Sequence, residues 1–420
     1  MSLFKVLRRF FRNSAEASKK YLHIRVMLPL YQKLLVLRLR HKERINVVFI
    51  ASTLPMWRYQ KICSLLGGYS HFNVSIVILP FGVYSKEQQN EDVETLKAYF
   101  DSCGMKYYVG GEAFDIRKEL CPDILFYPQP YVGNYVAHND YCWLRDRLLC
   151  YSPYAFWTAI GEWSYNEPLH NYAWKLFYST ELHRKEAIKY AYNHGRNIEV
   201  VGYSNADSFL EQPHRDVWKL QEVRKKRVVW APHFSIFPDG LMVQSSFLSI
   251  AEFMLELAER YSDRIQFVFK PHPRLITELY KHEDWGITRT TDYYNEWATR
   301  SNTQLESGEF VDLFMTSDAM IHDCGSFSVE YHYSGNPVMF VAEDFERIVS
   351  EKGELGQLAM RLHYVGRCQE DIVGFIEQVV LEGNDPMRCG RKDFYNRYLL
   401  PPNGKSVAEN VVDVLLKAFA

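Results

Sequence analysis

The chain has 420 residues, of which 47% are hydrophobic and 24% charged, and its formal net charge is -2. That length suffices for two domains with separate cores, and the composition excludes a largely disordered chain. The eight cysteines form no C-x-x-C pair, which argues against a structural zinc site or a disulfide scaffold and favours a reducing, cytoplasmic location. The sequence has no signal-peptide pattern and no apolar run of about 18 residues, so we expect neither secretion nor a membrane span.

Basic charge is concentrated at the start of the chain. Residues 1–44 hold twelve Lys/Arg against two Glu, and leucines and aromatic residues are interspersed among them. A basic amphipathic segment of this kind can lie on an anionic membrane surface, where each basic residue contributes about 1 kcal/mol. The alternative is a helical pair that packs on the protein body with a solvated basic face.

Short β-branched strands alternate with helical stretches from residue 45 onward. This alternation predicts a mostly parallel, doubly wound α/β sheet with ligands at the carboxyl ends of its strands. In the first half the expected strands cover residues 45–51, 74–79, 105–109, 122–127 and 198–202.

A second alternating series follows a polar, helix-like stretch at residues 207–226. Its expected strands cover residues 228–231, 265–270, 319–321 and 337–341, and a last apolar-striped helix covers residues 406–420. Two doubly wound halves in one chain are expected to face each other across a cleft. We therefore expect a basic helical leader at residues 1–44, an acceptor domain at 45–215, a nucleotide-donor domain at 216–395 and a C-terminal segment at 396–420 that packs back on the first domain.

The turn after residues 319–321 suits a phosphate. Asp323, Gly325 and Ser326 lie between that strand and a helix predicted to begin at residue 327. Unpaired backbone N–H groups, the positive end of a helix dipole and a hydroxyl meet at such a point. The alternative is ordinary helix capping, for which Ser and Asp are common residues.

Two histidines follow predicted strands in the same half of the chain. His233 comes after Pro232, and His272 lies between Pro271 and Pro273, with Arg274 next. In a doubly wound sheet these turns and the turn at Asp323 meet at one edge. A single histidine in this position is usually a structural hydrogen-bonding residue, but two rigidly held histidines favour a site.

Transfer at a phosphate fits these residues best. One histidine can accept a proton from an attacking hydroxyl, while a second histidine, an arginine and backbone N–H groups stabilise charge on phosphate oxygens. The sequence has no Asp-x-Asp motif or compact His/Asp/Glu ligand set, so we expect no metal and no cofactor. P-loop, dinucleotide-binding and nucleophile-elbow motifs are absent, and no nucleic-acid-binding module is recognisable. Cys324 beside His322 is better interpreted as a buried thiol than as a nucleophile.

The same residues carry a family resemblance. Residues 270–273 (KPHP), 312–314 (DLF), 317–326 (SDAMIHDCGS), 330–331 (EY) and 336–338 (NPV) resemble the C-terminal half of the CDP-glycerol glycerophosphotransferases. These are teichoic-acid primases and polymerases and related capsule enzymes of the cell envelope, with a GT-B fold. The resemblance covers roughly residues 45–418, most specifically in the second half.

This resemblance implies a role for each matching residue. It assigns His233 as the base on the acceptor hydroxyl, His272 with Arg274 and Ser326 to the donor pyrophosphate, and Glu330 to the nucleotide ribose. Asp323 is expected on the nucleotide side and Gly325 on the phosphate side. The family commonly has Thr-Asp-Tyr-Ser-Ser where this chain has residues 322–326, HDCGS, so glycine replaces one phosphate-binding hydroxyl.

The resulting hypothesis is a transferase that moves glycerol phosphate, or a related polyol phosphate, from a CDP-activated donor to a hydroxyl of a surface glycan or lipid-linked precursor, releasing CMP. One alternative is a GT-B nucleotide-sugar glycosyltransferase of surface polysaccharide synthesis. Another is a non-catalytic glycan-binding subunit that retains a relic site. We expect the protein at the inner face of the membrane, with its anionic surface as a partner.

Overall fold

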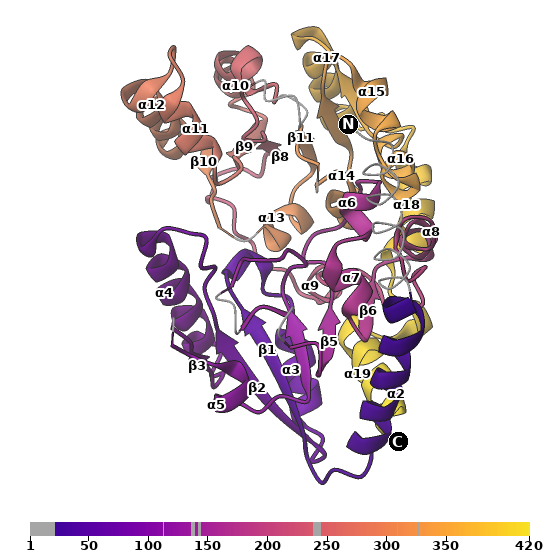
Figure 1. The fold of residues 1–420 in the computed structure, drawn as a ribbon. Coiled ribbons are helices and arrows are strands. Elements are labelled where there is room, and N and C mark those ends of the chain that lie inside the picture. Colours follow the sequence, from indigo (N-terminus) through magenta and orange to yellow (C-terminus); the bar gives the residue numbers. More distant parts are fainter. Residues whose placement is uncertain are drawn as a thin grey trace, which may run out of the picture. The chain divides into compact units, whose positions relative to one another are not determined.

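In the computed structural model the chain divides into two compact α/β units (Figure 1). The structure describes residues 22–111, 113–135, 139–141, 144–237, 245–308, 310–325 and 327–420. Unit 1 comprises the described parts of Met1–Ala155 together with Ile160–Asp207 and Pro401–Ala420. Unit 2 comprises Phe156–Ala159 and the described parts of Ser208–Leu400.

Unit 1 is built on a seven-stranded parallel sheet in the order β3-β2-β1-β4-β5-β6-β7. All but one residue of β1 and all residues of the central strand, β4, are buried, because helices cover both faces of a doubly wound sheet. The strands are β1 (Ile45–Ala51), β2 (Phe72–Ile78), β3 (Tyr108–Val109), β4 (Ile124–Tyr127), β5 (Leu148–Tyr151), β6 (Lys175–Tyr178) and β7 (Ile198–Val200).

The helices of unit 1 vary from one turn to nearly five turns. They are η1 (His23–Met27), α2 (Leu28–Leu39), η2 (Leu54–Met56), α3 (Gln60–Gly67), α4 (Lys86–Ser102), α5 (Ile116–Glu119), α6 (Glu162–Tyr165), α7 (Pro168–Tyr172), α8 (Glu181–Tyr190), η8 (Pro402–Gly404) and α19 (Val407–Phe419). A further helix, α9 (Ala206–Leu210), begins at the end of unit 1 and continues into unit 2.

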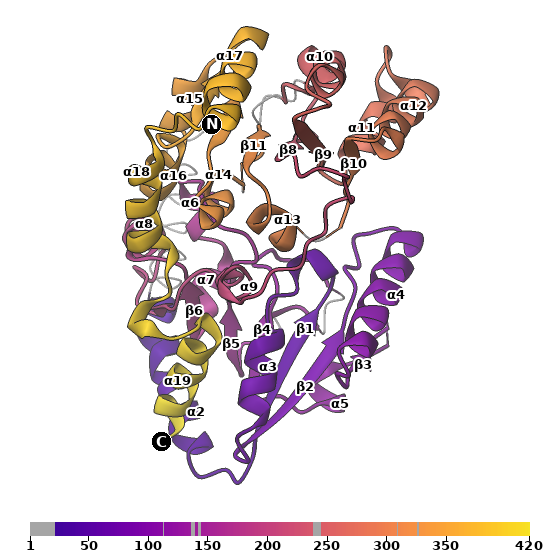
Figure 2. The ribbon, with the colours of Figure 1, turned by 180° about the vertical axis from the view of Figure 1, so that it is seen from behind.

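The last helix of the chain packs on unit 1, beside α3 and α2 (Figure 2). Ser406 and Glu409 form a capping box at its first turn, and the Asp207 carboxylate accepts hydrogen bonds from the N–H groups of Val407 and Ala408. Gly202 has φ 103°, and a Cβ there would lie 2.9 Å from Val407 Cγ2. A glycine at this position therefore allows the C-terminal segment to approach the end of β7.

Unit 2 is built on a six-stranded parallel sheet in the order β10-β9-β8-β11-β12-β13. The strand order reverses between β8 and β11, which is where doubly wound sheets bind ligands. The strands are β8 (Lys226–Ala231), β9 (Ile265–Phe269), β10 (Thr303–Leu305), β11 (Ala319–His322), β12 (Val338–Val341) and β13 (Tyr364–Gly366).

The helices of unit 2 flank this sheet, with α11 beside α12 and α15 beside α16 in both views (Figures 1 and 2). Trp230, Phe247, Phe269 and Trp297 form the aromatic centre of the core on one side. The helices are α10 (Phe247–Arg260), α11 (Leu275–Lys281), α12 (Gly286–Thr299), α13 (Val311–Met315), α14 (Phe327–Glu330), η5 (Tyr331–Ser334), α15 (Phe345–Ser350), α16 (Glu354–Met360), α17 (Gln369–Gly374), η6 (Phe375–Leu381), α18 (Arg388–Phe394) and η7 (Tyr395–Leu399).

The polar stretch at residues 207–226 was expected to be largely helical, and this expectation is wrong. After α9 no helix occurs at residues 211–225. Arg215 instead pairs with Asp312, and Trp218 Nε1 donates to Thr316 Oγ1 at 3.0 Å. These tertiary hydrogen bonds replace the local ones that a helix would have made.

Candidate active site

The site lies at the carboxyl ends of β8, β9 and β11, where the order of the second sheet reverses. His233 follows β8, His272 follows β9 and Asp323 follows β11. The two imidazole centroids are 5.1 Å apart, and the His272 N–H donates to the carbonyl of Pro232. The sheet therefore brings together three turns that are separated by 39 and 51 residues in the sequence.

Asp323 connects the turn after β11 to the turn after β8 and to the start of α10. Its Oδ1 accepts from the His233 N–H at 2.6 Å. Its Oδ2 accepts from Ser245 Oγ at 2.8 Å, and from the N–H and Oγ of Ser246 at 2.7 and 2.8 Å. The carboxylate is buried, so four charge-assisted hydrogen bonds satisfy it and hold the backbone of His233 in place.

The imidazole of His233 has a hydroxyl partner. Its Nδ1 lies 2.8 Å from Ser235 Oγ and 3.4 Å from the Ser235 backbone nitrogen, so it can donate to the hydroxyl or accept from the backbone N–H. In the tautomer whose Nδ1–H donates to the hydroxyl, the lone pair of Nε2 can accept a proton. Burial lowers the pKa of His233 below its ordinary value; the Asp323 carboxylate opposes this shift, and the positive charges of Arg274 and Lys352 add to it. At neutral pH the ring is therefore an uncharged base.

His272 accepts a backbone hydrogen bond at Nδ1. Its Nδ1 accepts the backbone N–H of Arg274 at 3.2 Å, so the proton of the neutral ring lies on Nε2. Burial, followed by the neighbouring charges of His233, Arg274 and Lys270, lowers the pKa of His272 to about 3. This ring is therefore a neutral hydrogen-bond donor at physiological pH.

Phe234 packs against both imidazoles. Its ring centroid is 4.3 Å from that of His233 and 4.5 Å from that of His272, and the Arg274 guanidinium lies 4.0 Å above it. Arg274 also pairs with Glu278 at 3.4 Å. The aromatic face and the carboxylate hold the guanidinium beside both histidines.

A chain of buried histidines supports the turn before Gly325. His363 Nδ1 lies 3.0 Å from the carbonyl oxygen of Ala359, which can only accept, so Nδ1 carries the proton. Burial lowers the pKa of His363 to about 4, and its neutral Nε2 accepts from His322 Nε2 at 3.2 Å. His322 Nδ1 lies 3.2 Å from the backbone nitrogen of Cys324 and 3.1 Å from its carbonyl oxygen. A chain of hydrogen bonds thus connects the core to this turn.

The remaining predicted residues lie on or next to the same turn. Gly325 follows Cys324 directly, whereas Ser326 lies outside the described residues. Glu330 ends α14 and is buried. In the part of the chain that the structure describes, no group of three or more His, Cys, Asp or Glu side chains is arranged to hold a metal ion.

Sequence reasoning missed Ser235, Ser245, Ser246 and Lys352. Ser235 could have been found from its position two residues after His233. Ser245, Ser246 and Lys352 have no such signal in the sequence, because only the fold brings them to the turn. Lys352 lies after α15, and its ammonium is 3.9 Å from the position that a Cβ would take at Gly325.

A family model matches residues 161–417, more than half of the chain, and it describes CDP-Glycerol:Poly(glycerophosphate) glycerophosphotransferase. The chain belongs to this glycerophosphotransferase family. It is therefore an enzyme of the glycerophosphotransferase family, and the resemblance seen in the sequence is confirmed. The family name implies CDP-glycerol as donor and poly(glycerophosphate) as acceptor. Comparison with curated proteins finds no match.

Solved structures are similar to the transferase in fold. The wall teichoic acid polymerase TagF, solved as a histidine variant, is 11% identical over 100% of this chain and 99% of its own, with a TM-score of 0.53. UDP-GlcNAc 2-epimerase from Neisseria meningitidis is 14% identical over 89% of this chain and 100% of its own, with a TM-score of 0.54. A putative UDP-N-acetylglucosamine 2-epimerase from Listeria monocytogenes is 13% identical over 90% of this chain and 97% of its own, with a TM-score of 0.58. These likenesses confirm the expected GT-B-type α/β fold with two parallel sheets.

Proposed function

We propose that this transferase moves glycerol phosphate, or a related polyol phosphate, from a CDP-activated donor to a hydroxyl of a surface glycan or lipid-linked precursor, and that it releases CMP. The observation that carries this proposal is the pair of neighbouring imidazoles, His233 and His272, whose ring centroids are 5.1 Å apart in a member of this family. Such a pair supplies one base and one neutral donor at the same point.

His233 acts as the general base in this proposal. Its Nε2 takes the proton of the acceptor hydroxyl, while the Nδ1–H donates to Ser235 Oγ, 2.8 Å away. The acceptor oxygen forms a bond to the phosphorus next to the polyol, and the bond from that phosphorus to the oxygen of CMP breaks. Because Asp323 holds the His233 backbone, the base is positioned before substrate binds.

His272 and Arg274 stabilise the donor phosphates. The His272 Nε2–H donates to a phosphate oxygen, and the guanidinium of Arg274 adds a full positive charge next to it. Gly325 and Ser326 are assigned to the donor phosphates, and Glu330 is assigned to the ribose. Asp323 is assigned to positioning on the nucleotide side, because its oxygens already accept four protein hydrogen bonds.

The experiment that tests this proposal identifies the released nucleotide. The purified protein is incubated with CDP-glycerol, CDP-ribitol or a panel of nucleotide sugars, with and without a membrane glycolipid fraction. We expect CMP from a CDP-polyol only when an acceptor is present. Release of a nucleoside diphosphate from a nucleotide sugar would instead indicate a glycosyltransferase, and a biological effect that survives loss of both histidines would indicate a glycan-binding subunit.

The pH dependence of transfer follows from the lowered pKa of His233. The base is lost when its ring is protonated, so the rate falls as the pH falls through this pKa, and it stays level above it. We expect kcat/KM for the CDP-polyol to be constant from about pH 7 upward and to decline only below about pH 6.5, the ordinary value for histidine. Both donor phosphates are esterified and carry no proton in this range. An acid limb centred at or above pH 7 would contradict His233 as the base.

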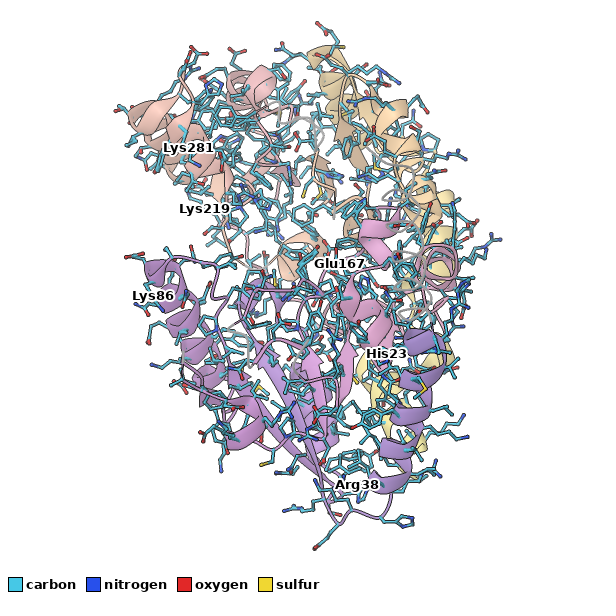
Figure 3. The ribbon with its side chains drawn as sticks, in the orientation of Figure 1. His23, Arg38, Lys86, Glu167, Lys219 and Lys281 are labelled. Carbon is cyan, nitrogen blue, oxygen red and sulfur yellow. The ribbon has the colours of Figure 1, made fainter. Side chains whose placement is uncertain are left out.

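The described part of the N-terminal leader exposes an apolar face. No helix among the described residues is long and apolar enough to cross a membrane. In η1 and α2, however, Met27, Leu30 and Leu34 are 56%, 56% and 64% exposed. The opposite side packs on unit 1, where Gln32 Nε2 donates to the carbonyl of Tyr172. Figure 3 labels His23 near the start and Arg38 near the end of this helical segment.

We further propose that this face lies on the inner surface of the cell membrane. The exposed basic residues Lys33, Arg38 and Arg40 lie on the same helix or next to it, which suits anionic lipid headgroups. The other half of the predicted leader, residues 1–21, lies outside the described residues.

Substituting the exposed leucines tests this membrane contact. We expect Leu30→Gln with Leu34→Gln to lower binding to phosphatidylglycerol vesicles by about tenfold or more, because two large apolar side chains leave the membrane. Sedimentation with vesicles measures this effect. Leu220→Gln is the matched control, since Leu220 is 94% exposed in unit 2. Equal sedimentation of both variants would contradict the proposal.

A further inference from the structure

Lys352 presents a cation to the turn after β11. Its ammonium lies 3.9 Å from the place of a Cβ at Gly325, and its positive charge acts on His233 and on Cys324. The side chain is half-buried. Among the residues that the structure describes, no hydrogen bond or ion pair to this ammonium is found. The Glu351 carboxylate acts on this ammonium through space without forming an ion pair with it. An anion that binds next to the partly desolvated ammonium would therefore be stabilised.

The other cations near the site have partners. Arg274 pairs with Glu278, and Lys270 Nζ donates to the carbonyl of Gly308 at 2.6 Å. Arg347, on the helix that precedes Lys352, pairs with Asp344 and Glu351. Lys352 therefore differs from its neighbours in having its charge available for a ligand.

The backbone of Lys352 is held firmly. Lys352 forms an antiparallel bridge with Ala159, and the next N–H, that of Gly353, donates to the carbonyl of Thr158 at 2.8 Å. A Cβ at Gly356 would lie 2.9 Å from Lys352 Cβ and 3.0 Å from Thr158 Cβ. A glycine in α16 thus allows this close packing, which fixes where the lysine side chain begins.

The absence of a side chain at Gly325 gives the ammonium access to the turn. A serine at this position would add a hydroxyl to a Cβ that itself lies 3.9 Å from Lys352 Nζ. With glycine, residue 325 offers only its backbone N–H group, which carries a partial charge. Lys352 adds a full positive charge at the same point.

We propose that Lys352 binds the pyrophosphate of the donor through its ammonium, in the place where a hydroxyl on residue 325 would otherwise contact it. This inference rests on the proposed function, and it adds a residue that contacts the donor. The ammonium hydrogen-bonds an anionic oxygen of the diphosphate and stabilises the charge that develops on the leaving CMP. The chemical class that it recognises is a diphosphate, whichever base the nucleotide carries.

Calorimetric binding of CDP, UDP, CMP and inorganic pyrophosphate tests this inference. We expect Lys352→Met to weaken CDP and pyrophosphate binding by about 10- to 100-fold, and CMP binding by less, because a charge-assisted hydrogen bond to the diphosphate is lost. Lys352→Arg should restore most of the affinity. Gly325→Ser should recover part of it in the Lys352→Met protein, since the hydroxyl then fills the same place. Arg347→Met is the control, and it should bind all four probes as the unsubstituted protein does.

The outcomes separate this inference from the proposed function. Unchanged pyrophosphate and CDP affinity in both Lys352→Met and Lys352→Gln, with unchanged thermal unfolding, would overturn the role of Lys352 while leaving CDP-polyol transfer in place. Binding of UDP but not CDP, with the expected dependence on Lys352, would support the inference and overturn the CDP donor. Failure of the unsubstituted protein to bind any diphosphate would overturn both.

Discussion

Replacing His233 with alanine is expected to reduce the rate of CMP release by about 10²- to 10⁴-fold, the usual contribution of a general base. The loss should appear in kcat and not in the KM of the donor, because His272 and Arg274 still bind the phosphates. Steady-state kinetics with CDP-glycerol and an acceptor fraction measures both constants.

The control for this substitution is His282→Ala. His282 lies at the end of α11 in the same unit, and its ring is 5.7 Å from that of Phe237. We expect its kcat to stay within about twofold, since surface substitutions away from a site have small effects. If His233→Ala retained more than a tenth of the rate, another group would have to accept the proton. A large rise in the donor KM would instead make His233 a binding residue.

Replacing Asp323 with asparagine is expected to damage both stability and turnover. The amide presents an N–H₂ group to donors that now meet a carboxylate oxygen, so we expect a loss of about 2–4 kcal/mol in the free energy of unfolding. The turn that carries His233 then shifts, and a displacement of about 1 Å costs roughly 10²-fold in rate. Denaturant unfolding and steady-state kinetics measure the two effects.

The residual activity of Asp323→Asn should also have a different pH profile. The negative charge of Asp323 raises the pKa of His233 against the effect of burial. Without it the pKa falls further, so the acid limb of kcat/KM moves to lower pH. Asp344→Asn is the matched control, because Asp344 caps α15 by accepting from the N–H of Arg347 and should leave the acid limb unchanged. An acid limb that stays in place in Asp323→Asn would show that the Asp323 carboxylate does not affect the pKa of His233.

The longer strands of both sheets could be predicted because parallel strands buried on both faces are apolar and β-branched. Residues 45–51 and 265–270 were recognised in this way, and β1 and β9 lie there. The strands β5 and β6 were missed, since Tyr, Cys and Lys interrupt their short apolar runs. Their pairing with β4 and with each other, and not their own sequence, makes them strands.

His233, His272 and Asp323 were predicted from their place after strands, and the sheet does bring them to one edge. The protonation of the two histidines could not be predicted, because it depends on which atoms face each Nδ1. Ser235 lies beside Nδ1 of His233, and the backbone N–H of Arg274 lies beside Nδ1 of His272. Both partners are near in sequence, but only the folded chain brings them to these nitrogens. The four donors to Asp323 come from two segments, and their approach is a matter of packing.

The sequence by itself determined the fold class, the family and the turns on which the chemistry depends, because hydrophobic periodicity and short motifs are local properties of the chain. The tertiary structure decided which groups meet at those turns. Lys352 lies 80 residues from His272, and no local pattern distinguishes it from a solvated lysine. Its place beside Gly325 follows from the pairing of Lys352 with Ala159 and the packing of Gly356, which are contacts between distant segments. The burial of a side chain and the electrostatic effect of its neighbours depend on all the segments that surround it. Both are therefore properties of the folded protein and not of any local stretch of sequence.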